Sequence, residues 1–379
     1  MIDLAPVRAF LEPRHVELGG RAAAFGRERL ADVHPGDDDE ARARARELCG
    51  LLGAGGWLDP IRDQDFRACC VLREEIAARS PLADAVFALQ ALGSTPIALA
   101  GSPELTAEWL EPAIRGEKIA AFAMTEPEAG SDVGAIATTA VRDGDSYVLD
   151  GTKTLISNAG IADFYVVFAS TDPDAGTRGL SAFVVPADAD GLSYVRPLVM
   201  SDPHPLGEIA FEGCRVPASH RLGEEGAGFR IGMSTLDRLR PTVGAAACGM
   251  AARALDEAIV HAKERRQFGK PLADFQLTQE KIGRMATDLT AARLLVYRAA
   301  WERDRGAERT DVEAAMAKGF ATETAQRVVD DAVQIVGGRG ALADHPVDRL
   351  YRAVRALRIY EGTTEIQRLI VARHVLGQA

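Results

Sequence analysis

A single glutamate, Glu361, stands in a short glycine-containing break between two stretches with helical spacing. Apolar residues recur every three or four positions in residues 347–357 and again in 366–370. Thr364 and Gln367 have the spacing of a capping box, which predicts the start of the second helix. A carboxylate presented between helix ends could serve as a general base. A solvated loop glutamate is the ordinary interpretation of such a motif, so the assignment depends on the rest of the chain.

Four other stretches place Gly, Ser, Thr and charged residues inside otherwise regular patterns: 121–132, 234–241, 264–271 and 334–340. The first could donate hydrogen bonds to a ligand or be a surface turn before a strand. In the second, Asp237 and Arg240 share one helix face, where they could hold a polar ligand or each other.

The remaining two stretches have simple structural explanations. The cations of 264–271 suit the C-terminal end of a helix dipole. The glycine run in 334–340 ends a helix instead of joining a strand to one, which argues against a dinucleotide-binding loop. The seven histidines show no pairing with acids or serines that would favour a nucleophilic triad or a metal site.

Composition narrows the class of protein. The 379 residues carry a formal net charge of −11, which argues against nucleic acid and anionic membrane as partners. The five cysteines are odd in number and scattered, so neither a disulfide framework nor a zinc site is expected. No stretch is expected to be long and apolar enough to span a membrane, and no signal peptide is visible at the N-terminus. We therefore predict a cytoplasmic protein.

The pattern of the sequence changes twice, from helical to strand-like and back, which predicts an α+β protein of three domains. Residues 1–118 read as an N-terminal helical domain, 119–225 as a central antiparallel β domain, and 226–379 as a C-terminal helical bundle domain resembling a four-helix bundle. Two Asp-Gly pairs, at 143–144 and 150–151, predict hairpins. The expected C-terminal helices are 239–265, 276–303, 311–336, 346–359 and 364–376.

In combination the polar stretches resemble the acyl-CoA dehydrogenase family of FAD-dependent flavoproteins. The similarity rests on Thr-Glu-Pro-x-Ala-Gly-Ser-Asp at 125–132, on Arg-x-Gln-Phe-Gly and Gln-x-x-Gly-Gly-x-Gly further on, and on Ile-Tyr-Glu-Gly-Thr at 359–363. It covers residues 119–376 and, more loosely, the N-terminal helices. It implies α,β-dehydrogenation of an acyl-CoA thioester to the trans-2-enoyl-CoA, in fatty acid or carboxylic acid catabolism. Electrons would pass to an electron transfer flavoprotein, and the assembly would be a homotetramer, a dimer of dimers.

The resemblance also implies roles for individual residues. Glu361 is the implied catalytic base, and no metal is implied. The isoalloxazine ring would be bordered by Phe122, Met124, Thr125, Leu155, Ile156 and Ser157. Across a dimer interface, the rest of FAD would contact Arg265, Gln267, Phe268, Phe275, Gln276, Gln334, Gly337 and Gly338, with Thr363 and Glu365 completing the site. Ser131 would contact flavin or the CoA arm, and substrate would also contact Asp237, Arg240, Tyr360 and Gly362.

The implied mechanism meets two physical needs, a close base and a stabilised enolate. The thioester oxygen would accept hydrogen bonds from the Glu361 N–H and a flavin ribityl hydroxyl. Glu361 would take the α-proton while flavin N5 takes the β-hydride, and an apolar pocket would raise the proton affinity of the carboxylate. A few family members carry the base on the helix after the sheet. The candidate there is Leu239, which cannot accept a proton.

Three departures from the family pattern touch substrate fit and electron exit more than the dehydrogenation chemistry, and the first of them keeps an oxidase or oxygenase open. Leu155 stands where an aromatic residue, often Trp, is usual; residues 201–205 lack Gly-x-Arg; and 56–60 replace a Gly-Gly turn. A flavin-dependent acyl-CoA oxidase or oxygenase, or a non-catalytic module binding CoA or flavin, are the alternatives. Rapid reoxidation of the reduced flavin by air would indicate the oxidase or oxygenase. Failure of every acyl-CoA to reduce the flavin would indicate the binding module. No cation falls in an identifiable acyl pocket, so a dicarboxyl substrate is not indicated and the acyl group stays open.

Overall fold

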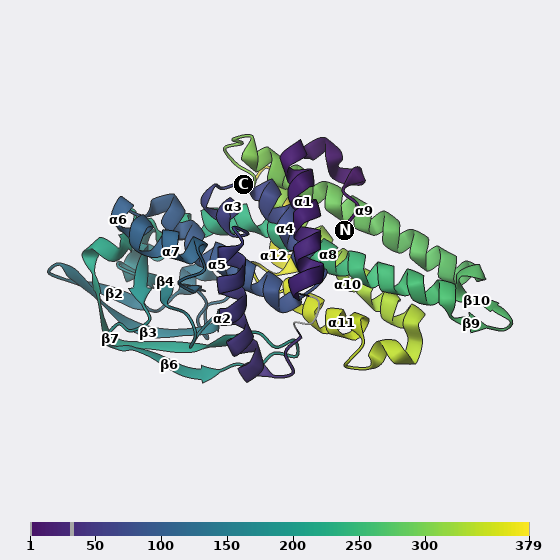
Figure 1. Ribbon diagram of the computed structural model, residues 1–379. Helices are drawn as coiled ribbons and strands as arrows, with labels where there is room; N and C mark the ends of the chain where they lie inside the picture. The colour runs from purple at the N-terminus through teal and green to yellow at the C-terminus, as the bar shows by residue number, and fades with distance from the viewer. Residues whose placement is uncertain (1, 31–33, 379) are drawn as a thin grey trace. The chain divides into compact units, whose positions relative to one another are not determined.

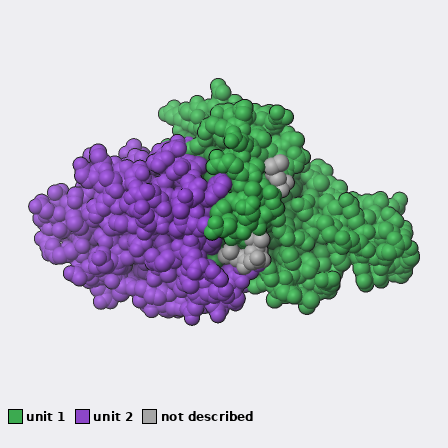
Figure 2. All heavy atoms as spheres, in the orientation of Figure 1, with its two compact units in different colours: residues 1–33, 65–84, 237–379 green, residues 34–64, 85–236 purple. Residues whose placement is uncertain are grey.

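The computed structural model describes residues 2–30 and 34–378. Contacts divide the chain into two compact units that do not follow chain order (Figure 2). Unit 1 contains residues 1–33, 65–84 and 237–379, and unit 2 contains 34–64 and 85–236. The α+β prediction is confirmed, with helices before and after a central, mostly antiparallel sheet in the sequence (Figure 1).

Unit 2 is organised around one eight-stranded sheet in the order β6-β7-β3-β2-β4-β5-β8, with β1 pairing on β4 in parallel. β4 is buried along its whole length, whereas the edge strand β6 is mostly exposed. The strands are β1 (Ala120–Ala123), β2 (Thr139–Asp143), β3 (Ser146–Ser157), β4 (Phe164–Ser170), β5 (Leu180–Pro186), β6 (Leu192–Pro197), β7 (Leu206–Pro217) and β8 (Arg221–Leu222).

Short helices of unit 2 are tied to the sheet through buried polar contacts. They are α2 (Asp38–Ala54), α3 (Asp59–Arg62), α6 (Pro103–Leu105) and α7 (Glu111–Ile114), together with most of α5 (Pro81–Ala100) and the first turns of α8 (Gly228–Glu264). The buried amide of Gln90 in α5 donates to the carbonyls of Ala113 and Lys118 and accepts from the Ala120 N–H. Gln90 therefore fixes the start of β1 against the helices.

Helix α5 corrects the expectation about membrane-spanning length. By length and composition it is apolar enough to cross a membrane, but 72% of its apolar window is buried. Burial of this kind is what a central core helix requires, since an apolar surface of that size would be costly in water.

Unit 1 is a bundle of long helices. It contains α1 (Pro13–Phe25), α4 (Phe66–Ala77), the remainder of α8, α9 (Gln276–Asp304), α10 (Asp311–Val336), α11 (Pro346–Leu357) and α12 (Thr364–Val375), with a small hairpin of β9 (Arg266–Gln267) and β10 (Lys270–Pro271). Helix α10 begins and ends at the predicted residues, whereas α8 begins at Gly228, well before the predicted residue 239.

Small residues let the helices of unit 1 approach closely, and buried ion pairs join them. A Cβ built on Gly249 of α8 would lie 2.0 Å from the Glu74 carbonyl oxygen of α4. Glu74 itself is buried, pairs with Arg293 at 2.6 Å and accepts from the Tyr297 hydroxyl at 2.6 Å. These contacts join α4, α8 and α9 into one core.

Two turn predictions meet different outcomes. The hairpin at Asp143-Gly144 is confirmed, with Gly144 at a φ of 61° between β2 and β3. The hairpin at Asp150-Gly151 is wrong, because β3 continues through Gly151 with a bulge against β7. Glycine is needed there for close approach, since a Cβ would lie 2.5 Å from the Thr138 hydroxyl oxygen.

The close packing at Gly249 gives a testable consequence for stability. We expect Gly249→Ala to lower the melting temperature markedly, because the new methyl group meets backbone and not a flexible side chain. Gly283→Ala is the matched control: it also lies inside a helix, with nothing within 4 Å of a built Cβ. That control should be neutral or stabilising by up to about 1 kcal/mol. Thermal unfolding of both variants checks this, and equal melting temperatures would contradict the packing argument.

Candidate functional site

Glu361 lies in the loop between α11 and α12, in an unusual backbone conformation. Its φ is 54°, and Gly362 follows at 92°, so two successive residues are left-handed. For a glutamate this conformation is strained and persists only when surrounding contacts hold it. Gly362 is required for the same reason, because an L side chain is strained at that φ.

Side chains from three helices hold this loop through its carbonyl groups. Arg240 of α8 donates to the Glu361 carbonyl at 3.1 Å, and Lys318 of α10 donates to the Gly362 carbonyl at 2.6 Å. Gln367 of α12 donates to both carbonyls, at 3.3 and 3.0 Å. The backbone that presents the carboxylate is thus fixed from α8, α10 and α12.

The capping box predicted at the start of α12 is wrong in its residues. The N-cap is Thr363, whose side chain accepts from the Ile366 N–H. Thr364 is buried and its hydroxyl donates to Glu323 at 2.8 Å, while Gln367 serves the loop carbonyls instead of the cap. The N-cap therefore lies one residue before the position that the Thr364–Gln367 spacing predicts, directly after Gly362.

The Glu361 carboxyl group lies among positive charges and is incompletely hydrogen-bonded. Within the described residues its Oε2 atom is buried and accepts no hydrogen bond. Burial raises the pKa of Glu361, and the positive charges of Arg73, Lys318 and Arg240 oppose that rise. Burial also lowers the pKa of the Lys318 ammonium to about 8, against the attraction of Glu361. A desolvated carboxylate with a free lone pair has the properties of a general base.

Asp237 and Arg240, for which two interpretations were open, bind each other at 2.6 Å. Arg240 is buried and also holds the Glu361 loop, so its guanidinium belongs to the loop scaffold. Burial raises the pKa of Asp237, with Arg240 opposing. Leu239 lies between these two residues in the sequence. It is buried, and its side chain has no atom that could accept a proton.

In unit 2, the predicted flavin-bordering residues lie on β1, β3 and the segment after β1. Phe122 is half-buried, and its ring centroid lies 4.8 Å from that of Phe168. The carbonyl of buried Met124 accepts from the Lys153 ammonium at 3.1 Å, and the Thr125 carbonyl accepts from the Thr154 N–H at 3.0 Å. β3 therefore fixes the backbone of residues 124–125.

A buried ion pair that sequence reasoning missed supports the same segment. Glu126 pairs with Lys153 at 2.7 Å and also accepts the N–H groups of Ala137 and Thr138. Burial lowers the pKa of Lys153 to about 8, and Glu126 opposes that change. A lysine inside the strand pattern of 146–157, among β-branched residues, is the sequence signal that would have found it.

β3 then changes its path at Leu155. This residue has a φ of 55° and is 58% exposed, and pairing with β7 is interrupted between Lys153 and Ile156. Ile156 is buried, with 1% of its surface exposed. Ser131 is exposed, in the turn that follows Glu126.

Two histidines correct the expectation that none pairs with an acid or a serine. The Ser157 hydroxyl lies 3.1 Å from His204 Nε2, and burial lowers the pKa of His204 to about 4. His15 Nε2 lies 3.2 Å from a carboxylate oxygen of Asp65. Both partners are far away in sequence, so no local spacing could reveal them.

The remaining predicted cofactor contacts lie at the other end of the long helices of unit 1. Phe268 forms the turn between β9 and β10 at a φ of 49° and is 93% exposed; its ring meets that of Phe275 edge to face at 6.2 Å. Figure 1 shows this hairpin at the tip of the bundle. Along α8, Arg240 and Glu264 are about 36 Å apart. A single chain therefore does not bring this hairpin to its own Glu361.

Other members of the predicted set are solvent-facing. Those that are exposed are Arg265, Gln267, Gln276, Gln334, Gly337, Gly338, Tyr360 and Glu365, and Thr363 is half-buried. Gly337 has a φ of 71°, and a Cβ built on either glycine would meet nothing within 4 Å. The glycine run thus ends α10, as expected, and leaves open space beside its backbone.

Two family models match this chain. The acyl-CoA dehydrogenase middle domain matches residues 121–214, and the acyl-CoA dehydrogenase C-terminal domain matches residues 226–376. The chain belongs to the acyl-CoA dehydrogenase family. The matched ranges contain Glu361 and every other residue that we predicted for the site.

Relatives within the acyl-CoA dehydrogenase family cover most of the chain. A 3-(aryl)acrylate reductase of Clostridium sporogenes is 45% identical over 82% of this chain and 83% of its own. The Caffeyl-CoA reductase-Etf complex subunit CarC of Acetobacterium woodii is 42% identical over 86% and 84%. Among solved structures, butyryl-CoA dehydrogenase of Megasphaera elsdenii matches with a TM-score of 0.89 and 34% identity, over 97% and 99% of the two chains. The FAD complex of PigA matches with a TM-score of 0.89 and 31% identity, over 97% and 98%.

The residues of this acyl-CoA dehydrogenase chain fit FAD. An exposed leucine on a β-bulge and an exposed aromatic hairpin offer apolar surface for ring systems. Two glycines with open space beside them allow a phosphate to approach the backbone closely. Hydroxyl groups at Thr125, Ser131 and Ser157 supply neutral hydrogen-bond donors.

The raised pKa of Glu361 has a consequence for stability. The folded protein binds a proton at this carboxyl more tightly than the unfolded chain does, so stability from this group is present at low pH and is lost as pH rises through the folded-state pKa. We expect Glu361→Gln to raise the melting temperature at pH 8, on the order of 1–3 °C. The gain should shrink as the pH falls toward 5. Glu308→Gln, an exposed loop carboxylate, is the control and should show no such trend. A lower melting temperature for Glu361→Gln at pH 8 would contradict the argument.

Proposed function

We propose that this acyl-CoA dehydrogenase family member oxidises an acyl-CoA thioester to the trans-2-enoyl-CoA, with Glu361 as the base. The observation that carries the proposal is the carboxylate itself, which is desolvated, surrounded by three cations and left with an unbonded oxygen. Bound FAD supplies the hydride acceptor for the β-carbon. All other requirements of the reaction fall on the residues of the chain.

The chain must position the base and stabilise negative charge on the thioester oxygen. The contacts that fix the Glu361 loop use the carbonyl groups of Glu361 and Gly362. We assign the Glu361 N–H to the thioester oxygen, where it would stabilise the developing enolate. Asp237, Tyr360 and Gly362 are our assignments for the remaining substrate contacts, with Ser131 at the CoA arm or the flavin. Arg240 contributes by holding the loop.

We also propose that the electron acceptor is an electron transfer flavoprotein and that the protein acts in the cytoplasm. One relative is named as a subunit of a complex with Etf, which supports the acceptor. Two relatives are named reductases of aryl-substituted substrates. The same base can add or remove the α-proton, so the redox partner would decide the direction of the reaction in the cell. A substrate panel should therefore include 3-arylpropionyl-CoA beside straight, branched and cyclic acyl-CoAs.

Anaerobic titration tests the reaction directly. At least one acyl-CoA of the panel should bleach the flavin absorbance, and Glu361→Gln should slow bleaching by about 10³-fold or more, since removing a base commonly costs 10²–10⁴-fold. Glu308→Gln is the control and should bleach at the normal rate. Full activity of Glu361→Gln would contradict the assignment of the base.

One observation keeps a second candidate function, an acyl-CoA oxidase or oxygenase, under test. Leu155 replaces the usual aromatic residue and is 58% exposed on its bulge, so this side of the site lacks a planar cover. Admitting air after bleaching separates the two functions. Rapid reoxidation with formation of peroxide would favour the oxidase over the dehydrogenase. Absence of bleaching by every acyl-CoA would favour a binding module.

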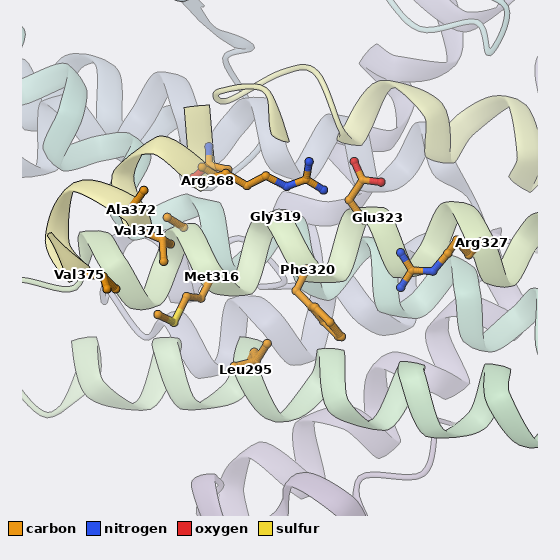
Figure 3. Close-up of a pocket in the computed structure, with 12 residues that line it drawn as sticks. Leu295, Met316, Gly319, Phe320, Glu323, Arg327, Arg368, Val371, Ala372 and Val375 are labelled. Atoms are coloured by element: carbon orange, nitrogen blue, oxygen red, sulfur yellow. The ribbon is translucent and has the colours of Figure 1, made fainter. Parts of the chain in front are cut away.

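We further propose a homotetramer, with each FAD held by two chains. Unit 1 contains a groove of about 520 Å³ between α9, α10 and α12. Figure 3 shows Leu295, Met316 and Phe320 pointing into it, with Val371 and Val375 of α12 at one end. Apolar surface of this kind usually marks an interface.

The hairpin supports sharing of the cofactor between chains. Phe268 in the hairpin and Leu277 at the start of α9 are 93% and 81% exposed, and both follow the end of α8, which lies about 36 Å along that helix from Arg240. In a twofold dimer, the hairpin of one chain could complete the site of the other, and each site would then contain one Glu361 and one foreign hairpin.

Complementation between two inactive variants tests this arrangement. Gln267→Ala/Phe268→Asp should abolish FAD binding by the hairpin, and Glu361→Gln should abolish proton abstraction. If sites are shared, a mixed dimer contains one site with both defects and one site with none. Co-expression should then restore roughly a quarter of the normal activity by random pairing. Mixed oligomers without activity would contradict sharing, and an active hairpin variant would contradict its role.

A further inference from the structure

A buried ion pair beside Glu361 has no part in the mechanism described so far. Arg73 of α4 and Asp84 in the first turn of α5 are 1% and 2% exposed. The guanidinium binds the carboxylate in a bidentate manner, with Nε and Nη2 each 2.8 Å from one oxygen. Its third arm, Nη1, donates to the Thr242 hydroxyl of α8 at 2.9 Å.

This pair lies near the base, because Thr242, which Arg73 binds, is two residues along α8 from Arg240, whose guanidinium donates to the Glu361 carbonyl. Among the cations that stabilise ionised Glu361, Arg73 has the largest effect, ahead of Lys318 and Arg240. Asp84 acts on the same carboxyl in the opposite sense. Arg73 also interacts with the side chain of Tyr360, the residue before the base. The charged groups around the carboxylate therefore come from α4, α5, α8 and α10.

Arg73 differs from the other two cations in what it binds. Lys318 and Arg240 donate to the carbonyls of Gly362 and Glu361, so their removal would change the loop backbone. The hydrogen bonds of Arg73 go to side chains of other elements. Arg73 therefore acts on Glu361 through its charge in a low-dielectric interior and through the Tyr360 side chain, while the loop carbonyls are bound by Arg240, Lys318 and Gln367.

The saturated geometry also argues against a substrate role. Releasing Arg73 to bind a carboxylate on the acyl chain would leave Asp84 buried without its partner, which is strongly unfavourable. A buried bidentate charge pair near a reactive carboxylate is instead suited to a fixed electrostatic task.

We propose that Arg73 is a positioning residue for the charge of the base: the Arg73–Asp84 pair sets the pH at which Glu361 becomes active. Arg73 keeps the carboxylate ionised in its desolvated loop, and Asp84 limits this effect so that the base retains a high proton affinity. The inference deepens the proposed function and rests on Glu361 being the base of that reaction.

Opposite shifts from two variants test the proposal. Asp84→Asn keeps the cation and removes the opposing anion, so the pH midpoint of anaerobic flavin reduction should move down. Arg73→Met/Asp84→Leu removes both charges with side chains of similar size, so the midpoint should move up by about one pH unit. A purely structural pair would lower the rate in both variants without shifts of opposite sign.

A matched control uses the neighbouring pair on α4. Glu74 of α4 and Arg293 of α9 are buried to a similar degree, and they bind each other and the Tyr297 hydroxyl, none of which belongs to the Glu361 loop. Glu74→Leu/Arg293→Met should therefore leave the pH midpoint where it is, whatever it does to stability. A shift equal to that of the Arg73→Met/Asp84→Leu variant would overturn the proposal.

A second measurement does not depend on catalysis. The gain in melting temperature from Glu361→Gln at pH 8 should increase in the Arg73→Met/Asp84→Leu background, because the carboxylate loses its strongest support. It should decrease in the Asp84→Asn background. If no acyl-CoA reduces the flavin, the proposed function fails while this measurement still decides the electrostatic inference. An unchanged gain in both backgrounds overturns it, and if Asp84→Asn does not fold, the double variant alone carries the test.

Discussion

Burial disfavours the ionised form of Glu361, and unit 1 places three cations near the carboxyl group that favour this form. A cation bonded directly to the carboxylate would resolve the conflict but would also lower its proton affinity and make it a poor base. The three nearby cations instead bond elsewhere: Lys318 to a loop carbonyl, Arg240 to a loop carbonyl and Asp237, and Arg73 to Asp84. Each stabilises the negative charge from a distance. The oxygen that must accept a proton stays unbonded within the described residues.

Unit 2 contains the contrasting case. Glu126 is also buried, but its oxygens accept two backbone N–H groups as well as the Lys153 ammonium. Those bonds lower its pKa although burial acts in the other direction. A carboxylate whose acceptors are occupied can hold a backbone segment but cannot take a proton from a substrate. Satisfaction of the oxygens, more than burial, therefore separates the structural glutamate from the candidate base.

Local patterns were sufficient wherever neighbours in sequence decide the structure. Both ends of α10, the second of them at Gly337, follow from periodicity and turn chemistry. The turn at Asp143-Gly144 does as well. The prediction failed where distant residues decide. Gly151 is a glycine because Thr138 lies against it, and Thr364 is no cap because Glu323 takes its hydroxyl.

The charged residues around the base show the same limit. Lys318 falls on the buried stripe of α10, between Ala314 and Thr322, and Arg73 lies among buried residues of α4. A charged residue at a buried helix position signals that a partner exists. The partner itself, a loop carbonyl in one case and Asp84 in the other, is set by packing that no local spacing encodes. Family motifs therefore led to Glu361 and Arg240 but not to Lys318 or Arg73, which also act on the charge of Glu361.

Helix length imposes the last constraint on the site. Helix α8 has 37 residues, and it carries Arg240 near its beginning and the hairpin with Phe268 after its end. Along this helix Arg240 and Glu264 are about 36 Å apart, so one chain keeps the two sets of predicted contacts apart. Phe268 is 93% exposed at this turn. An isolated chain therefore forgoes the favourable free energy of removing this apolar side chain from water. Cover by a cofactor and a second copy would account for both the distance and the exposure.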